Sequence, residues 1–455
     1  MSTAEVVPTR MQVAYGVGSL FTSIFGTLPQ VVLLYFMTSV LGIPPALAGA
    51  VVLTPKLVEV VFDPLLGMWS DRLHSRWGRR RPLMAAGTVL IAVTLPWLFN
   101  PHVYDNAAAT ALHVGVTFML CTVGYSLFFV PYLSMPTEMT DDPQQRTRLM
   151  AWRIGFLSLG VLVAGAGAPW IVRWAGGGAA GHVVMGWVFT GVCVAAMTVA
   201  VVGTARARQT AADGSHVVVW QQLRLVASNR PFVMLAGAYG LQVCAQGAFA
   251  AALPYYIAHV LQRPQQTAGV LFLCVTGTAL LALVPWVRLG RRLSKRQAYL
   301  AASALYALMS FSALLHDSVT PLGVLVAGFV LLGVGFGGME LFSHALLPDA
   351  AQQDRQVSGR NREALFSGVW IAVEKLGFAI GAAIVAGLLH LGGYAASTGG
   401  AAAVQPDAAV SAIRIAASVA PGLLFIASLV FIQRCRLPDD QPGARPAPKG
   451  GGETP

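Results

Sequence analysis

The stretch KLVEVVFDPLLGMWSDRLHSRWGRRRP, residues 56–82, decides the class of this protein. It begins inside an apolar run long enough for one helix, and five arginines follow that run. Lys56, Glu59 and Asp63 interrupt the run with a spacing of i, i+3 and i+7, which places them on one stripe of a helix. A charge that faces lipid costs several kcal/mol, so this pattern predicts a membrane span whose charged stripe faces a protein-lined or aqueous cavity.

The composition supports a membrane protein. The chain has 455 residues, of which 56% are hydrophobic and 11% charged, whereas soluble domains carry about 25% charged residues. A helix needs roughly 20 mostly apolar residues to cross a bilayer, and the sequence contains twelve such runs. We expect spans at 13–39, 45–71, 82–100, 109–136, 148–174, 182–203, 231–260, 266–289, 297–316, 319–347, 363–391 and 410–433. The fold class is therefore an all-α membrane protein, since lipid-facing segments must satisfy their backbone internally.

The basic residues are distributed unevenly along the chain. The net charge is +11, from 30 Lys and Arg against 19 Asp and Glu. Twenty-four of the basic residues fall in the N-terminal segment, the even-numbered connections and the tail, and three lie near odd-numbered connections. This is the positive-inside pattern. It predicts a multi-pass protein of the cell (inner) membrane with both termini cytoplasmic, and it argues against nucleic acid as the partner of the basic charge.

The chain divides into two similar halves. We expect an N-terminal six-helix bundle at 1–203, a central cytoplasmic loop at 204–230, a C-terminal six-helix bundle at 231–436 and a disordered tail at 437–455. Arginine-rich loops follow spans two and eight, and a proline and an acid precede a Gln- and Arg-rich loop after spans four and ten. Corresponding signals in corresponding positions indicate an internal duplication, hence two pseudo-symmetric bundles.

Further ionisable and amide groups interrupt other spans. The stripe of span two has two acids and one base, so it needs a positive partner: a metal cation, a proton or a base from elsewhere. Lys375, beside Glu374 in span eleven, is a candidate base. Arg153 in span five, Glu340 in span ten and Gln30 in span one also fit an aqueous cavity lined by both halves. The structural alternatives are an internal Lys56–Glu59 ion pair, local networks and helix–helix hydrogen bonds.

The charges at the cytoplasmic ends of the spans predict a gate. Asp71, Arg72 and Arg79 follow span two, and Glu138 and Asp349 end spans four and ten. Ion pairs among them would latch the two halves when the cavity faces outward. The alternative is that these charges only set the topology.

Four segments carry a family resemblance. They are YGVGSL at 15–20, DPLLGMWSDR…RWGRRRP at 63–82, VPYLSMPTEMTDDPQQRTRLMAWR at 130–153 and REALFSGVWIAVEKLG at 362–377. Together they resemble the glycoside–pentoside–hexuronide:cation symporters of the major facilitator superfamily, over nearly the whole chain. The resemblance implies the major facilitator fold.

The resemblance also implies roles for individual residues. Glu59 and Asp63 take the place of the family's two cation-binding carboxylates on helix two. Phe62 stands where the family pattern has an asparagine between them, and the loss of that oxygen favours a proton over sodium as the coupling ion. Ser23 and Phe129 stand at positions of family aspartates, which predicts a less polar substrate site.

The sequence thus predicts a secondary active transporter that couples a cation, a proton rather than Na+, to symport of a small solute, a sugar or glycoside, by alternating access. An exporter of a drug, metabolite or lysolipid-like amphiphile is the alternative. We expect a monomer in the lipid bilayer. The sequence has neither a nucleotide-binding P-loop nor hydrolase motifs, so we expect no cofactor and no enzymatic activity. The expected substrate-binding residues are Gln30, Lys56, Arg153, Glu340, Trp370 and Lys375.

Overall fold

The computed structural model describes residues 7–73, 75–140, 142–207, 226, 228–358, 363–399 and 404–435. Twelve helical spans in the described residues are long and apolar enough to cross a membrane, which confirms the predicted number. Most of the predicted loop 204–230 and all of the tail 437–455 lie outside the described residues. The domain boundaries that depend on them remain predictions.

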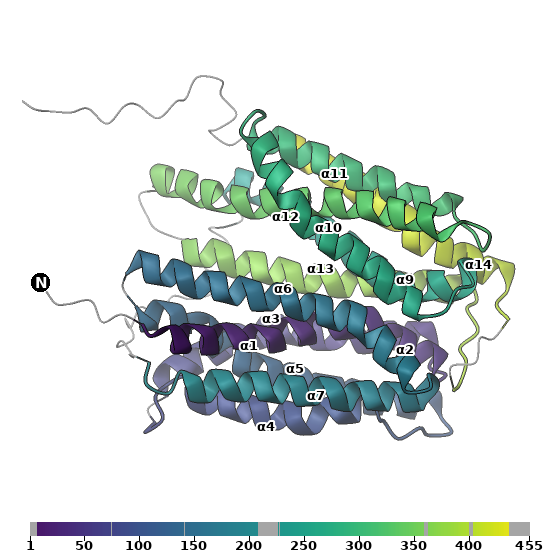
Figure 1. Ribbon diagram of the computed structural model, residues 1–455, viewed down its shortest axis with the longest axis horizontal. Helices are drawn as coiled ribbons and strands as arrows, with labels where there is room; N and C mark the ends of the chain where they lie inside the picture. The colour runs from purple at the N-terminus through teal and green to yellow at the C-terminus, as the bar shows by residue number, and fades with distance from the viewer. Residues whose placement is uncertain are drawn as a thin grey trace, which may run out of the picture.

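Six spans form each half. In the N-terminal half the elements are α1 (Thr9–Leu28), η1 (Pro29–Leu33), α2 (Leu34–Ser39), α3 (Pro45–Arg72), α4 (Arg81–Leu98), α5 (Ala107–Met139), α6 (Pro143–Trp174) and α7 (Gly178–Gly203). In the C-terminal half they are α9 (Arg230–Tyr255), η2 (Tyr256–Val260), α10 (Gln266–Gly290), α11 (Lys295–Ser312), η3 (Ala313–Leu315), α12 (Leu322–Ser358), α13 (Glu363–Leu391), α14 (Asp407–Arg414), η4 (Ile415–Val419) and α15 (Ala420–Arg434). Figure 1 shows the first set as the purple-to-teal layer and the second as the green-to-yellow layer.

The first span of each half carries the same irregularity. A stretch of π-helix, η1, begins at Pro29, and η2 begins at Tyr256, two residues after Pro254. Proline removes a backbone donor from the helical ladder and crowds the preceding turn, so a locally widened helix is the expected response. The matching positions support the predicted duplication.

The halves meet chiefly along two helix pairs, α3 with α13 and α6 with α10, and also where α9 contacts η1 and α2. We call the end of the bundle where α1 begins and α15 ends the basic end, and the other the opposite end. Close approaches between halves lie from the middle of the spans to the opposite end: Gly49 against Ala386, Gly165 against Phe272 and Gly269 against Trp170. Near the basic end of α3, by contrast, Leu65 and Trp69 are about half exposed. The structure is therefore closed at the opposite end.

Candidate functional site

Four charged residues meet where α3 faces α13. Lys56 Nζ donates to Glu59 Oε2 at 2.7 Å within α3. Lys375 Nζ, from α13, donates to Glu59 Oε1 and, at 2.5 Å, to Asp63 Oδ2. The side chain of Glu59 is fully buried and that of Lys375 is 12% exposed. We call these residues the charged tetrad.

The tetrad ties one half of the protein to the other. Two carboxylates and two ammonium groups make it formally neutral, which removes most of the cost of burying each charge alone. The sequence left three sources open for the positive partner of Glu59 and Asp63. In this conformation the partner is a base from elsewhere, Lys375, and the internal Lys56–Glu59 pair forms as well.

Aromatic rings line the tetrad. Lys375 Nζ lies 5.0 Å from the centre of the Phe129 ring and 5.4 Å from that of Tyr125, both on α5. Lys56 Nζ lies 5.6 Å from the Tyr125 ring. Such contacts stabilise an ammonium group most strongly where water is excluded. Sequence reasoning missed Tyr125, because an aromatic residue in an apolar span gives no signal that separates it from core packing.

Four buried polar atoms near the interface have no hydrogen-bond partner among the described residues: Asp63 Oδ1, Ser126 Oγ, Arg153 Nε and Trp370 Nε1. Ser126 on α5 lies within interaction range of Asp63. Buried polar groups in proteins are normally paired. These atoms are therefore available to a bound ion or solute, and Ser126 is a candidate that sequence reasoning missed.

Glu340 belongs to a second group of polar residues, in the C-terminal half. Its Oε1 accepts from Gln246 Nε2 at 3.4 Å, and its Oε2 lies 3.3 Å from His344 Nδ1. His344 stands edge-on to Trp370, whose ring stacks on Tyr239 at 4.1 Å. Trp370 is thus part of this group, which we call the C-half cluster.

Two other amides in the spans are not part of either group. Gln30 lies half-buried in η1, and none of the described residues forms a hydrogen bond with its side chain. Gln242 is fully buried, donates to Ser303 and Ser428 and accepts from Tyr299, so it serves helix–helix hydrogen bonding.

Tyrosine hydroxyls hold the opposite end closed. Tyr255 bonds Thr38 at 2.6 Å and Tyr394 bonds Ser39 at 2.9 Å, each across the two halves. Burial raises the pKa of Tyr394 to about 12. Its hydroxyl therefore stays protonated and able to donate throughout the physiological pH range.

Removing both hydroxyls should loosen this closure. In Tyr255→Phe/Tyr394→Phe, the loss of two bonds worth about 1 kcal/mol each should shift the equilibrium between closed and open opposite ends by roughly tenfold or more. Spin labels on cysteines at Trp174 and Leu315, exposed at this end in different halves, should report a larger population at long distance. Tyr256→Phe is the matched control, since that hydroxyl bonds Ala313 within one half. Equal effects in both proteins would contradict the assignment.

The predicted gate residues form ion pairs at the basic end. Arg80 pairs with Asp71 and Glu138, each at 2.7 Å, and Arg79 lies 3.3 Å from Glu138. Lys295 pairs with Asp349 at 2.6 Å. Each of these pairs joins helices or loops of one half. A latch between the two halves therefore remains a prediction for all five gate residues, Arg72 included. The sequence did not distinguish the central member, Arg80, within its run of three arginines.

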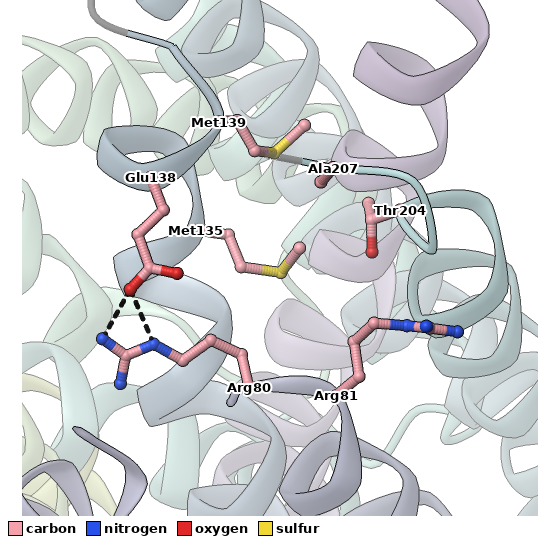
Figure 2. Close-up of a pocket in the computed structure, with 7 residues that line it drawn as sticks. All are labelled: Arg80, Arg81, Met135, Glu138, Met139, Thr204 and Ala207. Atoms are coloured by element: carbon pink, nitrogen blue, oxygen red, sulfur yellow. Dashed lines mark hydrogen bonds and ion pairs between the residues drawn. The ribbon is translucent and has the colours of Figure 1, made fainter. Parts of the chain in front are cut away.

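A hollow of about 280 Å³ adjoins this gate, lined by Arg80, Arg81, Met135, Glu138, Met139, Thr204 and Ala207. Figure 2 shows Arg80 turned toward Glu138, and Arg81 pointing away from them. Arg81 Nε donates to the carbonyl of Val201 at 2.9 Å. The hollow thus lies between the Arg80–Glu138 ion pair and Arg81, which links α4 to α7.

Comparison with known proteins gives a consistent result. A family model described as MFS/sugar transport protein matches residues 14–439. The putative glycoside/cation symporter YagG of Escherichia coli is 25% identical over 94% of this chain and 92% of its own. A putative 2,3-dihydroxypropane-1-sulfonate exporter of E. coli is 27% identical over 57% of each chain. A bacterial homologue of the human lysosomal transporter Spinster shares the fold, with a TM-score of 0.69, 14% identity and coverage of 93% and 96%.

Proposed function

Because the chain belongs to the MFS/sugar transport protein family, we propose that it is a cation-coupled symporter of a small solute, a sugar or glycoside, that works by alternating access. The protein is a membrane transporter and not an enzyme. Its family and its structural neighbours are membrane transporters as well. The observation that carries the finer proposal is the bridge from Lys375 to Glu59 and Asp63, which joins the two halves near their middle.

The coupling ion competes with Lys375. While Lys375 occupies both carboxylates, the halves are held together along α3 and α13. A cation or proton that neutralises Asp63 weakens this bridge and frees the halves to rock about the site. Asp63 Oδ1 has no hydrogen-bond partner in the part of the chain that the structure describes and can accept a proton, whereas Na+ needs several oxygen ligands at once. A proton is therefore the favoured coupling ion, with Na+ at Glu59 and Asp63 as the alternative.

The substrate site lies between the halves, in contact with both groups of polar residues. Arg153 Nε from the N-terminal half and Trp370 Nε1 from the C-terminal half are donors that no described residue pairs, and they suit hydroxyl or carboxylate oxygens of a solute. We place Lys56, Glu340 and Lys375 at its edges and keep Gln30 as a candidate. The names of relatives such as the glycoside/cation symporter support a glycoside.

We place the protein in the cell (inner) membrane as a monomer, with its basic end cytoplasmic. In this orientation the structure is open toward the cytoplasm. Asp71, Arg72, Arg79, Glu138 and Asp349 would then exchange partners between halves when the basic end closes. The membrane potential would contribute about 2.3 kcal/mol per charge per 100 mV to uptake.

Export is the second candidate function, and the similarity to the sulfonate exporter favours testing it. The arrangement of charges does not set the direction of transport. Proton movement driven by substrate in right-side-out against everted vesicles separates the two functions, because an exporter accumulates substrate only in the everted ones.

Glu59→Gln should abolish accumulation of substrate against a gradient, because the amide cannot take up the coupling ion. The amide keeps one of the two oxygen acceptors of Glu59, so one ammonium group loses its partner and the unfolding temperature should fall. Transport is therefore compared only on variant protein that is monodisperse and folded. Uptake of radiolabelled glycosides into proteoliposomes with an imposed proton or sodium gradient measures this. Asp105→Asn, on an exposed loop, is the control that should keep accumulation. Full accumulation by Glu59→Gln would refute the coupling role.

A further inference from the structure

A short stretch of extended chain from the C-terminal half lies against the N-terminal half at the opposite end. It follows α13 and comprises residues 394–399, which we call the strap. Leu41, just past the end of α2, forms an antiparallel bridge with Thr398. Beside this bridge, Gly399 N donates to the carbonyl of Val40 at 2.9 Å. The strap therefore pairs with the other half through backbone groups, as a β-strand would.

These contacts satisfy the carbonyl groups at the end of α2. The last carbonyls of a helix have no partner within it and need donors from elsewhere. Ser397 supplies two donors: its backbone N–H bonds the carbonyl of Thr38 at 3.0 Å, and its Oγ bonds that of Ser39 at 3.1 Å. With the bond from Gly399 to Val40, three consecutive carbonyls of the N-terminal half accept from the strap.

The C-terminal half holds the strap in shape by itself. Gln405 Nε2 donates to the carbonyl of Ala395 at 2.9 Å, and Gln405 Oε1 accepts from the amide of Ala395 at the same distance. The strap begins after Gly393 and ends at Gly399, whose φ angles of 69° and 73° lie in the left-handed region that glycine adopts most readily. The strap is thus preformed on one half and reaches across to the other.

We propose that the strap is the latch of the opposite end: it caps α2 across the two halves while this end is closed, and it releases α2 when the end opens. Each of its hydrogen bonds favours the closed form only about fivefold, because water replaces the lost partner on release. The latch can therefore hold the end closed and still let go. It rests on the proposed alternating access for its role in the cycle, but not for its contacts.

Gly399→Ala should weaken the latch without adding a clash. No heavy atom of the described residues lies within 4 Å of a Cβ built at Gly399, so the variant disfavours only the positive φ. Release of the strap relieves that strain, which should shift the equilibrium roughly tenfold toward an open opposite end. Spin labels carried on keto amino acids at Leu112 and Leu315, exposed in different halves, measure this in the purified full-length protein in lipid. The population at long distance should grow.

Gly176→Ala is the matched control. Gly176 lies in the turn between α6 and α7, with a φ of 93° and equally open surroundings, but its amide bonds the carbonyl of Arg173 in the same half. This variant should lower the unfolding temperature without changing the distances between the labels. An equal shift in both variants, or no shift in Gly399→Ala, would overturn the latch.

A disulfide tests the latch in the opposite sense. Residues that face each other in an antiparallel bridge have Cα atoms about 4.5–5.5 Å apart, which a disulfide can span. Leu41→Cys/Thr398→Cys, in a Tyr255→Phe background that loosens the same end, should lose its long-distance population on oxidation and regain it with a reductant. An oxidised protein that still opens would show that the strap travels with α2, and the proposal would be wrong. Failure of the transport proposal looks different: no substrate gradient forms in vesicles, while oxidation still locks the labels at short distance.

Discussion

Replacing Lys375 with methionine should destabilise the protein by about 3–5 kcal/mol, the typical cost of removing one partner of a buried ion pair. The ammonium group of Lys375 is the sole base in contact with Asp63 among the described residues, and it shares Glu59 with Lys56. Without it, one carboxylate of the tetrad remains buried and uncompensated. The thermal unfolding temperature in detergent should fall sharply, and transport should be lost with it.

A matched control and a rescue separate this explanation from simple loss of packing. Lys295→Met removes the same kind of ammonium group from a pair in which the lysine side chain is 36% exposed, so it should cost no more than about 1 kcal/mol. Lys375→Met/Asp63→Asn removes one charge of each sign, and most of the lost stability should return. If the double variant is no more stable than Lys375→Met, the electrostatic explanation is wrong.

Hydropathy determined most of the fold. The twelve expected spans match the observed helices because a bilayer demands a fixed apolar length. The largest differences are at the basic end, where α12 continues to Ser358 although its span was expected to end at 347, and where α6 begins at Pro143 rather than 148. Both extensions are polar. Hydropathy marks where a helix leaves the membrane, but not where it ends.

The site was predicted less completely. Charges inside apolar spans are expensive, so Glu59, Asp63 and Lys375 were conspicuous in the sequence. Their pairing across the halves was not, because it depends on how α3 packs on α13. Sequence reasoning missed Tyr125, Ser126 and His344 for a related reason. Single tyrosine, serine and histidine side chains are common in ordinary helix packing, so the sequence does not mark them as site residues. Only the three-dimensional arrangement gives them a role.

The second large effect concerns the packing that positions α13. Gly381→Val should prevent folding or cost well above the about 1–3 kcal/mol typical of overpacking. A Cβ at Gly381 would lie 2.1 Å from the carbonyl oxygen of Cys244 and 2.5 Å from the amide nitrogen of Ala248, both on α9. These are backbone atoms, so no side-chain rotation relieves the clash. The two helices would have to separate, and α13 would carry Lys375 and Glu374 out of place.

Gly387→Val provides the comparison on the same helix. No heavy atom of the described residues lies within 4 Å of a Cβ built there, so the added methyl groups should be accommodated with a change below about 0.5 kcal/mol. Yield of monodisperse protein and its unfolding temperature measure both variants. Equal behaviour of the two would show that α9 and α13 do not pack through Gly381. Loss confined to Gly381→Val would show that small residues, which let transmembrane helices approach closely, hold the charges of α13 at the interface between the halves.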